Sequence, residues 1–482
     1  MYRHRRRANN TFADLAEGDR LLELLDGLPL AIAQAASFLQ ETGIELQKYI
    51  EFYEQKWQEL MESRDWEGAP VQDYPDRSIW TTWAISFGAI QEMNVAAANL
   101  LLLWAFLDSK DLWYGLFTAA CSASITAATS LSEWIGEIGS NELEFTKAIG
   151  LLRNYSLIED VQGLGSYTTH PVVHRWAYYF QGEDSQLQLA QLAVIVVGWA
   201  VPHISSRDYA TLQRRLLPHA QACSRWVVMN GTRQWSTQES RSIMIKLVEE
   251  RVVIPDAVML LGILYVDQGK LGEAEKMYER ALQGFETALG PEHPSTLQTV
   301  NNLGILYADQ GKLGKAEKMY ERALQGKETV LGPEHILTLS TINNLGLLYA
   351  KQGKLGEAEK MYERALQGYE KALGTNFETY IPALNTIWGL ASVLECQTEF
   401  VKARTMYSKA LNGYENAVGP DHPRSRDLRD KLHALDTVTD NNALVEVRTL
   451  VNVIQEEASG SSTRERPSKS KRHRLLNKLG LR

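Results

Sequence analysis

A repeated segment is the feature that most constrains what this chain can fold into. The sequence LGILYVDQGKLGEAEKMYERALQGFETALGPEH begins at Leu261, and a copy with only four differences begins 42 residues later, at Leu303. A third copy begins at Leu345, and a decayed fourth copy, which opens with WGLASVLECQ, begins at Trp388. Repeats of this length are typical of helical arrays in which each copy packs against its neighbours. The range 251–424 is therefore predicted to be an α-solenoid.

The pattern inside each copy predicts two helices. In the second copy, Leu303, Gly304 and Tyr307 belong to the first helix, and Gly311 marks its end. The second helix carries an apolar stripe with the i, i+3, i+4, i+7, i+8 spacing of an amphipathic helix. The members of this stripe are Ala316, Met319, Tyr320, Ala323 and Leu324. One such pair cannot bury its apolar face alone, so the copies are expected to stack.

The order of glycine, tyrosine and alanine in each copy resembles the tetratricopeptide repeat. The 42-residue period and the linker LGPEHP are similar to the long-linker repeats of kinesin light chains and of fungal multidomain proteins. The resemblance implies that the first helices line a concave face, and that this face binds a peptide or protein ligand.

The positions expected to face this ligand groove lie on the first helices. They are Asp256, Met259, Gln298, Asn301, Ser340, Asn343 and Thr386. An asparagine can donate to and accept from a peptide backbone at once, which suits an extended or helical peptide. The alternative is that these asparagines only cover a solvated helix, and the sequence leaves both interpretations open.

Near the N-terminus, the pattern predicts a helical hairpin. Pro29 fits the first turn of a helix and Gly43 its end, and a second amphipathic stretch begins at Leu46. The segment DGLPLAIAQAASFL resembles the GLPLA motif of the NB-ARC family, the nucleotide switches of NLR-type immune and cell-death regulators. In that family the proline of the motif lies against the adenine of a bound nucleotide. The resemblance implies this role for Pro29.

Helices followed by a short β-hairpin predict a winged-helix-like domain in the next segment. SLIEDV and SYTTH are the strands, QGLG is the turn, and His170 and Pro171 open a closing helix. The segment TTHPVVHRWA is similar to the MHD motif of the NB-ARC family, whose histidine contacts the β-phosphate. The resemblance implies this role for His170, at a helix N-terminus that suits phosphate. Thr169 and Pro171 replace the methionine and the aspartate, so the aspartate's role is not carried over.

Two further segments are predicted to be helical. The apolar run Leu100–Leu107 predicts a buried helix, and YATLQRRLLPHAQACSRWV, which begins at Tyr209, predicts a polar-faced one. A similar RRLLPHA segment joins the winged helix to the repeats in fungal proteins that combine NB-ARC with repeats. This similarity supports one inherited architecture from the GLPLA motif to the last repeat.

The chain lacks two sequence elements that a nucleotide switch needs. Neither a GxxxxGK[ST] phosphate loop nor an acidic Walker-B strand is found. We therefore expect no enzymatic activity and no catalytic residue, and ADP or ATP as a cofactor only together with the missing P-loop domain. Either the chain is a truncated product or the nucleotide domain was lost, and both explanations stay open. No metal site is expected, because His170 and His174 lack both the glutamate of HExxH and a third ligand.

These features predict a mainly α-helical chain with several parts. They are a flexible basic N-terminus at 1–20, a helical NB-ARC remnant at 21–72, a winged-helix-like domain with a small β-hairpin at 73–181, a helical connector at 182–250, tetratricopeptide repeats at 251–424, a capping helix at 425–457 and a disordered basic tail at 458–482.

Charge and composition narrow the expected partners. The net charge of −9 and the lack of a basic cluster on the winged-helix-like segment disfavour nucleic acid. Three isolated cysteines indicate a reducing compartment, and no apolar run approaches the ~20 residues that span a membrane. We expect a cytoplasmic location, with nuclear import through the basic tail as an alternative, and self-association is left open.

The leading interpretation is a scaffold or sensor of an NLR-like signalling protein that binds a peptide or protein through its repeats. The alternative is a cargo adaptor like kinesin light chain. That family carries a heptad coiled coil before its repeats, and residues 1–250 show none.

Overall fold

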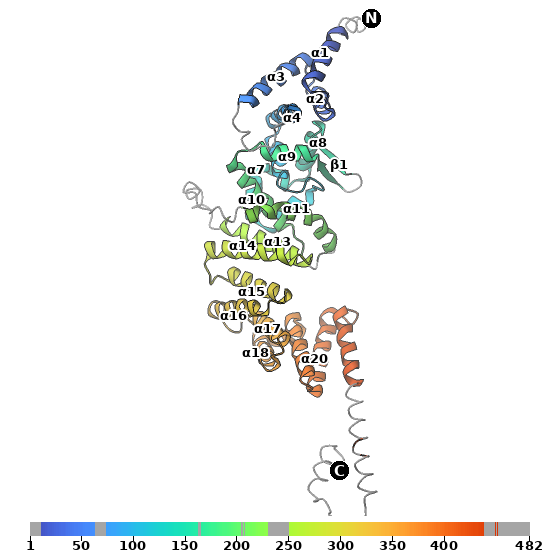
Figure 1. Ribbon diagram of the computed structural model, residues 1–482. Helices are drawn as coiled ribbons and strands as arrows, with labels where there is room; N and C mark the ends of the chain where they lie inside the picture. Colours follow the sequence, from blue (N-terminus) through green and yellow to red (C-terminus); the bar gives the residue numbers. More distant parts are fainter. Residues whose placement is uncertain are drawn as a thin grey trace, which may run out of the picture. The chain divides into compact units, whose positions relative to one another are not determined.

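The computed structural model describes residues 11–62, 74–161, 165–203, 206, 208–229, 250–437, 449 and 451. The chain forms two compact units, Met1–Val330 and Leu331–Arg482. The first unit holds the N-terminal helices, a β-hairpin and the first two repeat copies, and the second unit holds the other two copies (Figure 1). This mainly helical architecture confirms the predicted fold class. The predicted basic tail lies outside the described residues.

The first part of unit one is a set of short helices. They are α1 (Thr11–Leu24), α2 (Pro29–Thr42), α3 (Leu46–Glu62), α4 (Tyr74–Met93) and α5 (Val95–Trp104). Pro29 begins α2, where its missing N–H costs no helical hydrogen bond, and Gly43 ends it with a φ of 66°. Phe38 of α2 packs on Tyr49 of α3 with ring centroids 5.3 Å apart. The predicted helical hairpin is present.

Further helices and a two-stranded sheet follow in the same unit. The elements are α6 (Tyr114–Ala123), α7 (Ile125–Ile135), η2 (Gly136–Gly139), α8 (Glu142–Asn154), β1 (Ile158–Val161), β2 (Ser166–Thr169), α9 (Pro171–Tyr179), α10 (Glu183–Trp199) and α11 (Tyr209–Met229). The strands are antiparallel, with Ile158 opposite Thr169 and Val161 opposite Ser166, as the turn sequence predicted. The bounds predicted for the buried helix at Leu100–Leu107 were wrong, because α5 ends at Trp104 and Leu107 is buried in the following turn.

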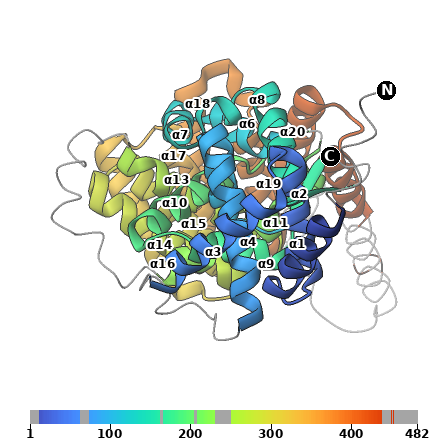
Figure 2. The same ribbon diagram turned by 90° about the horizontal axis from the view of Figure 1, so that it is seen from above.

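Aromatic side chains join α4 to α9, and both views show these helices side by side (Figures 1 and 2). Trp83 of α4 lies 6.1 Å from Trp176 of α9 between ring centroids, and Phe87 lies 5.6 Å from the same ring. All three side chains are buried. Large buried aromatic surfaces dominate core energetics, so this contact fixes α9 against the N-terminal helices.

The turn after α5 is held by α9. His174 places Nε2 3.0 Å from the carbonyl oxygens of both Trp104 and Leu107. Burial lowers the pKa of His174, so the neutral ring is the favoured form at this site. The histidine therefore stabilises the turn as a buried hydrogen-bonding residue.

The RRLLPHA segment of α11 contacts Asp108 and Asp111, which follow the turn after α5. Arg215 makes two hydrogen bonds to the Asp111 carboxylate, at 2.8 and 2.6 Å, and its guanidinium lies 4.1 Å from the Trp113 ring centroid. His219, one helical turn along, accepts from the Asp108 N–H at 3.2 Å and is buried, which lowers its pKa. The polar residues of this motif therefore tie α11 to the stretch that precedes α6.

The repeat copies form helical hairpins in each unit. Unit one contains α13 (Glu250–Asp267), α14 (Leu271–Leu289), α15 (Pro294–Asp309) and α16 (Leu313–Val330). Unit two contains α17 (Ile336–Lys351), α18 (Leu355–Leu373), η4 (Gly374–Thr379), α19 (Ile381–Cys396) and α20 (Phe400–Val418). Residues 423–437 are also helical, so the predicted capping helix is present in part, and most of its remainder lies outside the described residues. Across the described helices, none is both long and apolar enough to span a membrane.

Three linkers share a glycine with positive φ and a histidine that caps the next helix. Their glycines have φ values of 92°, 96° and 93°, which side chains rarely adopt. These are Gly290, Gly332 and Gly419. Three residues later a histidine caps the next helix, because its Nδ1 accepts from the N–H two residues on. These are His293, His335 and His422.

The fourth copy has a longer offset than the sequence pattern suggested. Helices α14, α16 and α18 begin 42 residues apart, but α20 begins 45 residues after α18. The extra residues lie in the linker that contains η4. Thr398, with a φ of 65°, then takes the place of Gly353, with a φ of 76°. The start predicted at Trp388 was wrong, since the structural equivalent of Leu345 is Leu390.

Candidate ligand-binding surface

Glycine–tyrosine contacts press the two helices of a copy together. A Cβ on Gly304 of α15 would lie 2.6 Å from the Tyr320 ring of α16, and one on Gly346 of α17 would lie 3.0 Å from the Tyr362 ring of α18. These distances leave no room for a side chain on the glycine. The glycine side of α15 and of α17 is therefore covered by the second helix of its own copy, and a ligand would have to approach another side.

On α15 and on α17, each taken by itself, the side away from these glycine contacts carries partly exposed residues, here called the exposed stripe of that helix. In the second copy it consists of Gln298, Asn302 and Ile305, and in the third of Ser340, Asn344 and Leu347. The i, i+4, i+7 spacing places each set on one face. Ile305 and Leu347 are 38% and 48% exposed, so apolar surface lies beside amide groups in both copies.

The predicted groove residues fall into two groups. Five of them are half-buried: Asp256, Gln298 and Ser340 at equivalent places of their helices, and Met259 and Asn343 three residues further along theirs. Asn301 and Thr386 are 3% and 0% exposed, and the Thr386 hydroxyl donates to Oδ1 of Asn343 at 2.9 Å. The structure thus brings Thr386 and Asn343 together but buries Thr386 and Asn301.

The longer fourth copy changes which residue matches the predicted asparagines. Trp388, not Thr386, is equivalent to Asn301 and Asn343, because the offset is 45 residues. Sequence reasoning also missed the amides of Asn302 and Asn344. The i+4 spacing from the stripe positions already predicted was the signal that could have found them.

In two copies, the first residue of the stripe accepts a hydrogen bond from a residue of the second helix in the same copy. In the fourth copy the Tyr414 hydroxyl donates to Oδ1 of Asn385 at 2.5 Å. In the second copy the equivalent pair is Lys327, whose Nζ donates to Oε1 of Gln298 at 3.0 Å. Burial lowers the pKa of Lys327 to about 8 and raises that of Asp256, in the first copy, to about 6. Both shifts arise because burial disfavours the charged form.

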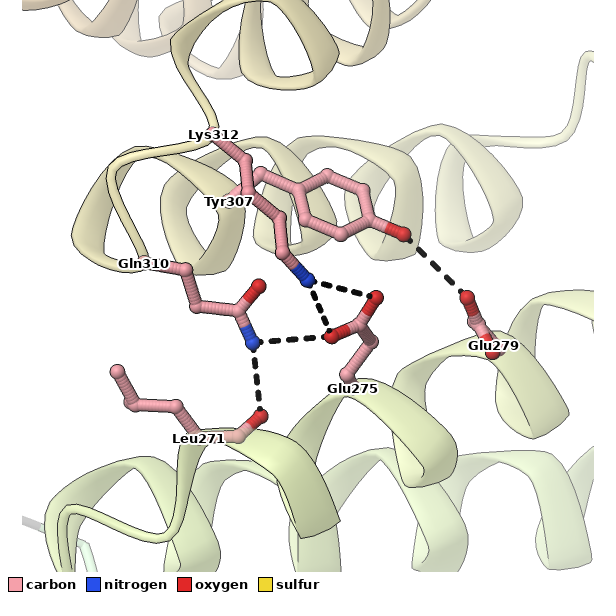
Figure 3. A network of polar contacts seen from close by, with 6 residues as sticks. All are labelled: Leu271, Glu275, Glu279, Tyr307, Gln310 and Lys312. Carbon is pink, nitrogen blue, oxygen red and sulfur yellow. Dashed lines mark hydrogen bonds and ion pairs between the residues drawn. The ribbon is translucent and has the colours of Figure 1, made fainter.

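Polar contacts hold the second copy against the first within unit one (Figure 3). Gln310 Nε2 donates to Oε2 of Glu275 at 3.0 Å, and the Lys312 ammonium pairs with the same oxygen at 3.0 Å. The Tyr307 hydroxyl donates to Oε1 of Glu279 at 3.3 Å. All three donors come from α15 or the turn after it, and both acceptors come from α14. These contacts set the position of α15 and of its exposed stripe.

The two residues implied in nucleotide binding lie at helix N-termini of unit one. Both side chains are exposed, and Nδ1 of His170 accepts from the Val172 N–H at 3.3 Å, so it caps α9. Pro29 begins α2, whose Gln34 donates to the Ser156 carbonyl oxygen at 2.5 Å. These residues alone do not fit a nucleotide, since they face solvent and the ring of His170 already binds a free N–H. The roles implied for Pro29 and His170 stay predictions.

In the part of the chain that the structure describes, no three His, Cys, Asp or Glu side chains are placed to hold a metal ion. His174 is occupied by the turn after α5, so it does not pair with His170.

Comparison with known proteins identifies the repeats. The family model of the tetratricopeptide repeat matches residues 256–329 and 301–371. These residues are tetratricopeptide repeats. The family predicted from the glycine, tyrosine and alanine positions is thus confirmed.

The chain is also similar to an NLR-like protein. The nucleotide-binding leucine-rich repeat (NLR)-like protein of Hyaloscypha variabilis is 29% identical over 291 residues, which are 59% of this chain and 26% of the relative. The match confirms the predicted resemblance to NLR-like proteins. The chain spans about a quarter of the relative's length.

Solved structures with partial likeness also contain tetratricopeptide repeats. A putative kinesin light chain of Podospora anserina with nearly identical repeats is 20% identical and covers 44% of this chain and all of its own, with a TM-score of 0.35. A STAND protein with a tetratricopeptide repeat sensor from Pyrococcus horikoshii is 14% identical and covers 86% of this chain and 66% of its own, with a TM-score of 0.33.

Proposed function

We propose that this chain is the sensor part of an NLR-like signalling protein, and that its tetratricopeptide repeats bind a peptide or protein ligand through the exposed stripe. The family of the repeats and the NLR-like relative support an interaction role. The observation that carries the finer proposal is the stripe itself. Ile305 and Leu347 are exposed at equivalent positions, each three residues after a half-buried asparagine.

This combination suits peptide recognition for a physical reason. An asparagine amide offers both a donor and an acceptor to a peptide backbone, while an exposed leucine or isoleucine gains free energy when a ligand covers it. Burial of apolar area contributes about 25 cal/mol per Å² before the entropy cost of binding is subtracted. Amides therefore set the register of a ligand, and apolar side chains supply most of the affinity.

A displayed library of random peptides, selected on the full chain, tests this proposal. Binders should lose affinity about tenfold or more when Leu347→Glu places a charge on the stripe, because an apolar contact becomes a buried carboxylate. Lys360→Glu, an exposed position on α18 of the same copy, serves as the matched control. Equal affinity for both variants would move the binding site away from the stripe.

A sensor differs from a cargo adaptor in what the ligand does. Ligand binding to a sensor of this class should change the assembly state of the chain, whereas an adaptor should bind its cargo with no such change. Light scattering of the full chain with and without a selected peptide distinguishes the two. An unchanged mass with saturating peptide favours the adaptor alternative.

We further propose that this chain turns over no nucleotide by itself, since its sequence contains no phosphate loop. Pro29 and His170 would complete a nucleotide site only together with a domain that supplies this loop. Equilibrium binding of ADP to the full chain, compared with a His170→Ala variant, measures this directly. Tight binding that the variant abolishes would contradict the proposal.

A further inference from the structure

A fully buried histidine of α11 uses both of its ring nitrogens on residues 108–112, here called the bridging segment. Nδ1 of His219 lies 3.2 Å from the Asp108 backbone nitrogen, and Nε2 lies 3.3 Å from the Asp111 carbonyl oxygen. A backbone N–H can only donate and a carbonyl oxygen can only accept. The ring is therefore neutral, with its proton on Nε2, and Nδ1 has to stay free of a proton.

The bridging segment also holds the β-hairpin of the same unit. The Ser109 carbonyl oxygen accepts from the Thr169 N–H at 2.9 Å and from the Thr168 hydroxyl at 3.2 Å. Leu112 and Tyr167 exchange two backbone hydrogen bonds, at 3.0 and 2.8 Å. The segment thus lies between α11 on one side and β2 on the other, and a change at His219 acts on both.

A second proton on His219 has no acceptor in this arrangement. On Nδ1 it would meet the Asp108 N–H, so that two donors face each other and a buried N–H loses its partner, which is costly. Burial itself also disfavours the charged ring and lowers the pKa of His219. Once the segment moves away, water can reach the ring and the charge is tolerated. Protonation and opening are therefore coupled.

The second histidine near this segment behaves differently. His174 of α9 donates from Nε2 to the carbonyl oxygens of Trp104 and Leu107, each at 3.0 Å. This nitrogen carries a proton in the neutral and in the charged ring alike. Burial lowers the pKa of His174 as well, but a second proton removes neither hydrogen bond. His174 is therefore a matched comparison for His219 on the same stretch of chain.

Three charged groups face His219. The carboxylates of Asp108 and Asp111 favour the charged ring and the Arg215 guanidinium opposes it, while Asp108 also faces His174. Burial opposes the charge of the Asp111 carboxylate, but hydrogen bonds from Arg215 hold its pKa below the ordinary value. This ion pair therefore stays charged between pH 7 and pH 5. Asp111 also has a φ of 59°, a strained conformation that the surrounding contacts have to hold.

We propose that His219 is a proton-operated switch: a second proton on Nδ1 breaks its hydrogen bond with the Asp108 N–H and releases the bridging segment, with β2, from α11. This inference is independent of ligand binding at the stripe. The neutral ring's contribution to the closed form is fully present above the ordinary pKa of 6.5 and is lost as the pH falls below it. The opening equilibrium should rise about tenfold from pH 7 to pH 5.

Hydrogen exchange of the full chain, followed by mass spectrometry at pH 5, 6 and 7 and corrected for the intrinsic rate at each pH, tests this proposal. Fragments with the bridging segment and β2 should lose protection about tenfold from pH 7 to pH 5, while a fragment of α15 should keep it. His219→Asn supplies an oxygen that accepts from the Asp108 N–H at any pH, so it should abolish the loss. His174→Gln keeps a donor and should show the same loss as the unmodified chain.

Several outcomes would overturn the proposal. A loss of protection that persists in His219→Asn, or that disappears in His174→Gln, would assign the pH dependence to another group. If His219→Asn does not fold, the unmodified chain still decides the matter. Equal protection of the bridging segment at pH 7 and pH 5, or a loss that α15 shares, would show that no local switch operates there.

Discussion

At the scale of single residues, the contact between a glycine and a tyrosine sets how closely the two helices of a copy approach. Gly304 meets the Tyr320 ring and Gly262 meets the Tyr278 ring, each at a distance that excludes a Cβ. The tyrosines are buried, and burial raises their pKa values because the charged form is disfavoured there. The position of the exposed stripe thus depends on a missing methyl group on the opposite side of the same helix.

Gly304→Ala should therefore destabilise the chain, although alanine favours helices. A Cβ would lie 2.6 Å from the Tyr320 ring, and overpacking of this kind costs about 1–3 kcal/mol. Gly314→Ala is the matched control, because nothing lies within 4 Å of its Cβ and the change should stabilise the helix by roughly 0.5–1 kcal/mol. Urea unfolding midpoints measure both effects. Two variants that shift in the same direction would contradict this account of the contact.

The raised pKa of Asp256 leads to a second prediction at the scale of single residues. Its pKa is about 6, above the ordinary 3.8, because burial disfavours the carboxylate. The native state therefore binds the proton more tightly than the unfolded state, and the cost of the charge is fully present above pH 6 and absent below about pH 4. Asp256→Asn should stabilise the chain at pH 7.5 by about 1–2 kcal/mol, with the partial exposure discounted.

Thermal unfolding of both forms from pH 4 to pH 7.5 checks this prediction. The difference in midpoint between Asp256→Asn and the unmodified chain should shrink as the pH falls. A difference that stays constant, or grows towards pH 4, would show that the carboxylate is not penalised by burial.

At the scale of elements, the RRLLPHA segment of α11 holds the stretch around Asp111 by side-chain contacts. Arg215 and His219 hold the stretch around Asp111, and Leu112 of that stretch pairs with Tyr167 of β2 through hydrogen bonds of 3.0 and 2.8 Å. The connector helix and the β-hairpin are thus linked through one short segment inside unit one. A change at either end can reach the other through these contacts.

Arg215→Ala should loosen the β-hairpin. It removes a two-pronged ion pair between half-buried side chains and the stacking on Trp113, so hydrogen exchange at the Tyr167 N–H should speed up by about tenfold or more. Arg214→Ala is the control, since the adjacent Nε donates only to Ala210 of its own helix at 3.1 Å. Equal exchange rates at Tyr167 in the two variants would mean that the contact between Arg215 and Asp111 does not support the strand.

The elements that could be predicted from the sequence are those that depend on residues close together in the chain. The repeat helices and the hairpin depend on spacing and turn residues that are close in sequence, and they were predicted correctly. The fourth copy was misplaced because its linker is longer, which put Thr386 where Trp388 belongs. The hydrogen bond from Lys327 to Gln298 could not be predicted, because it joins residues 29 positions apart and only the packing of α16 on α15 reveals it.

At the scale of the whole molecule, the chain matches about a quarter of an NLR-like relative and carries the tetratricopeptide repeats that a sensor would need. We propose that the ligand lies along the first helices of the repeats.

Photo-crosslinking of a selected peptide measures this most directly. A photoreactive residue in place of Ile305, on the exposed stripe of α15, is compared with one in place of Lys318, which is exposed on α16. The account predicts that the peptide crosslinks efficiently at position 305 and at background level at position 318, and that unlabelled peptide competes the crosslink away. Efficient, competable crosslinking at 318 with none at 305 would contradict the claim.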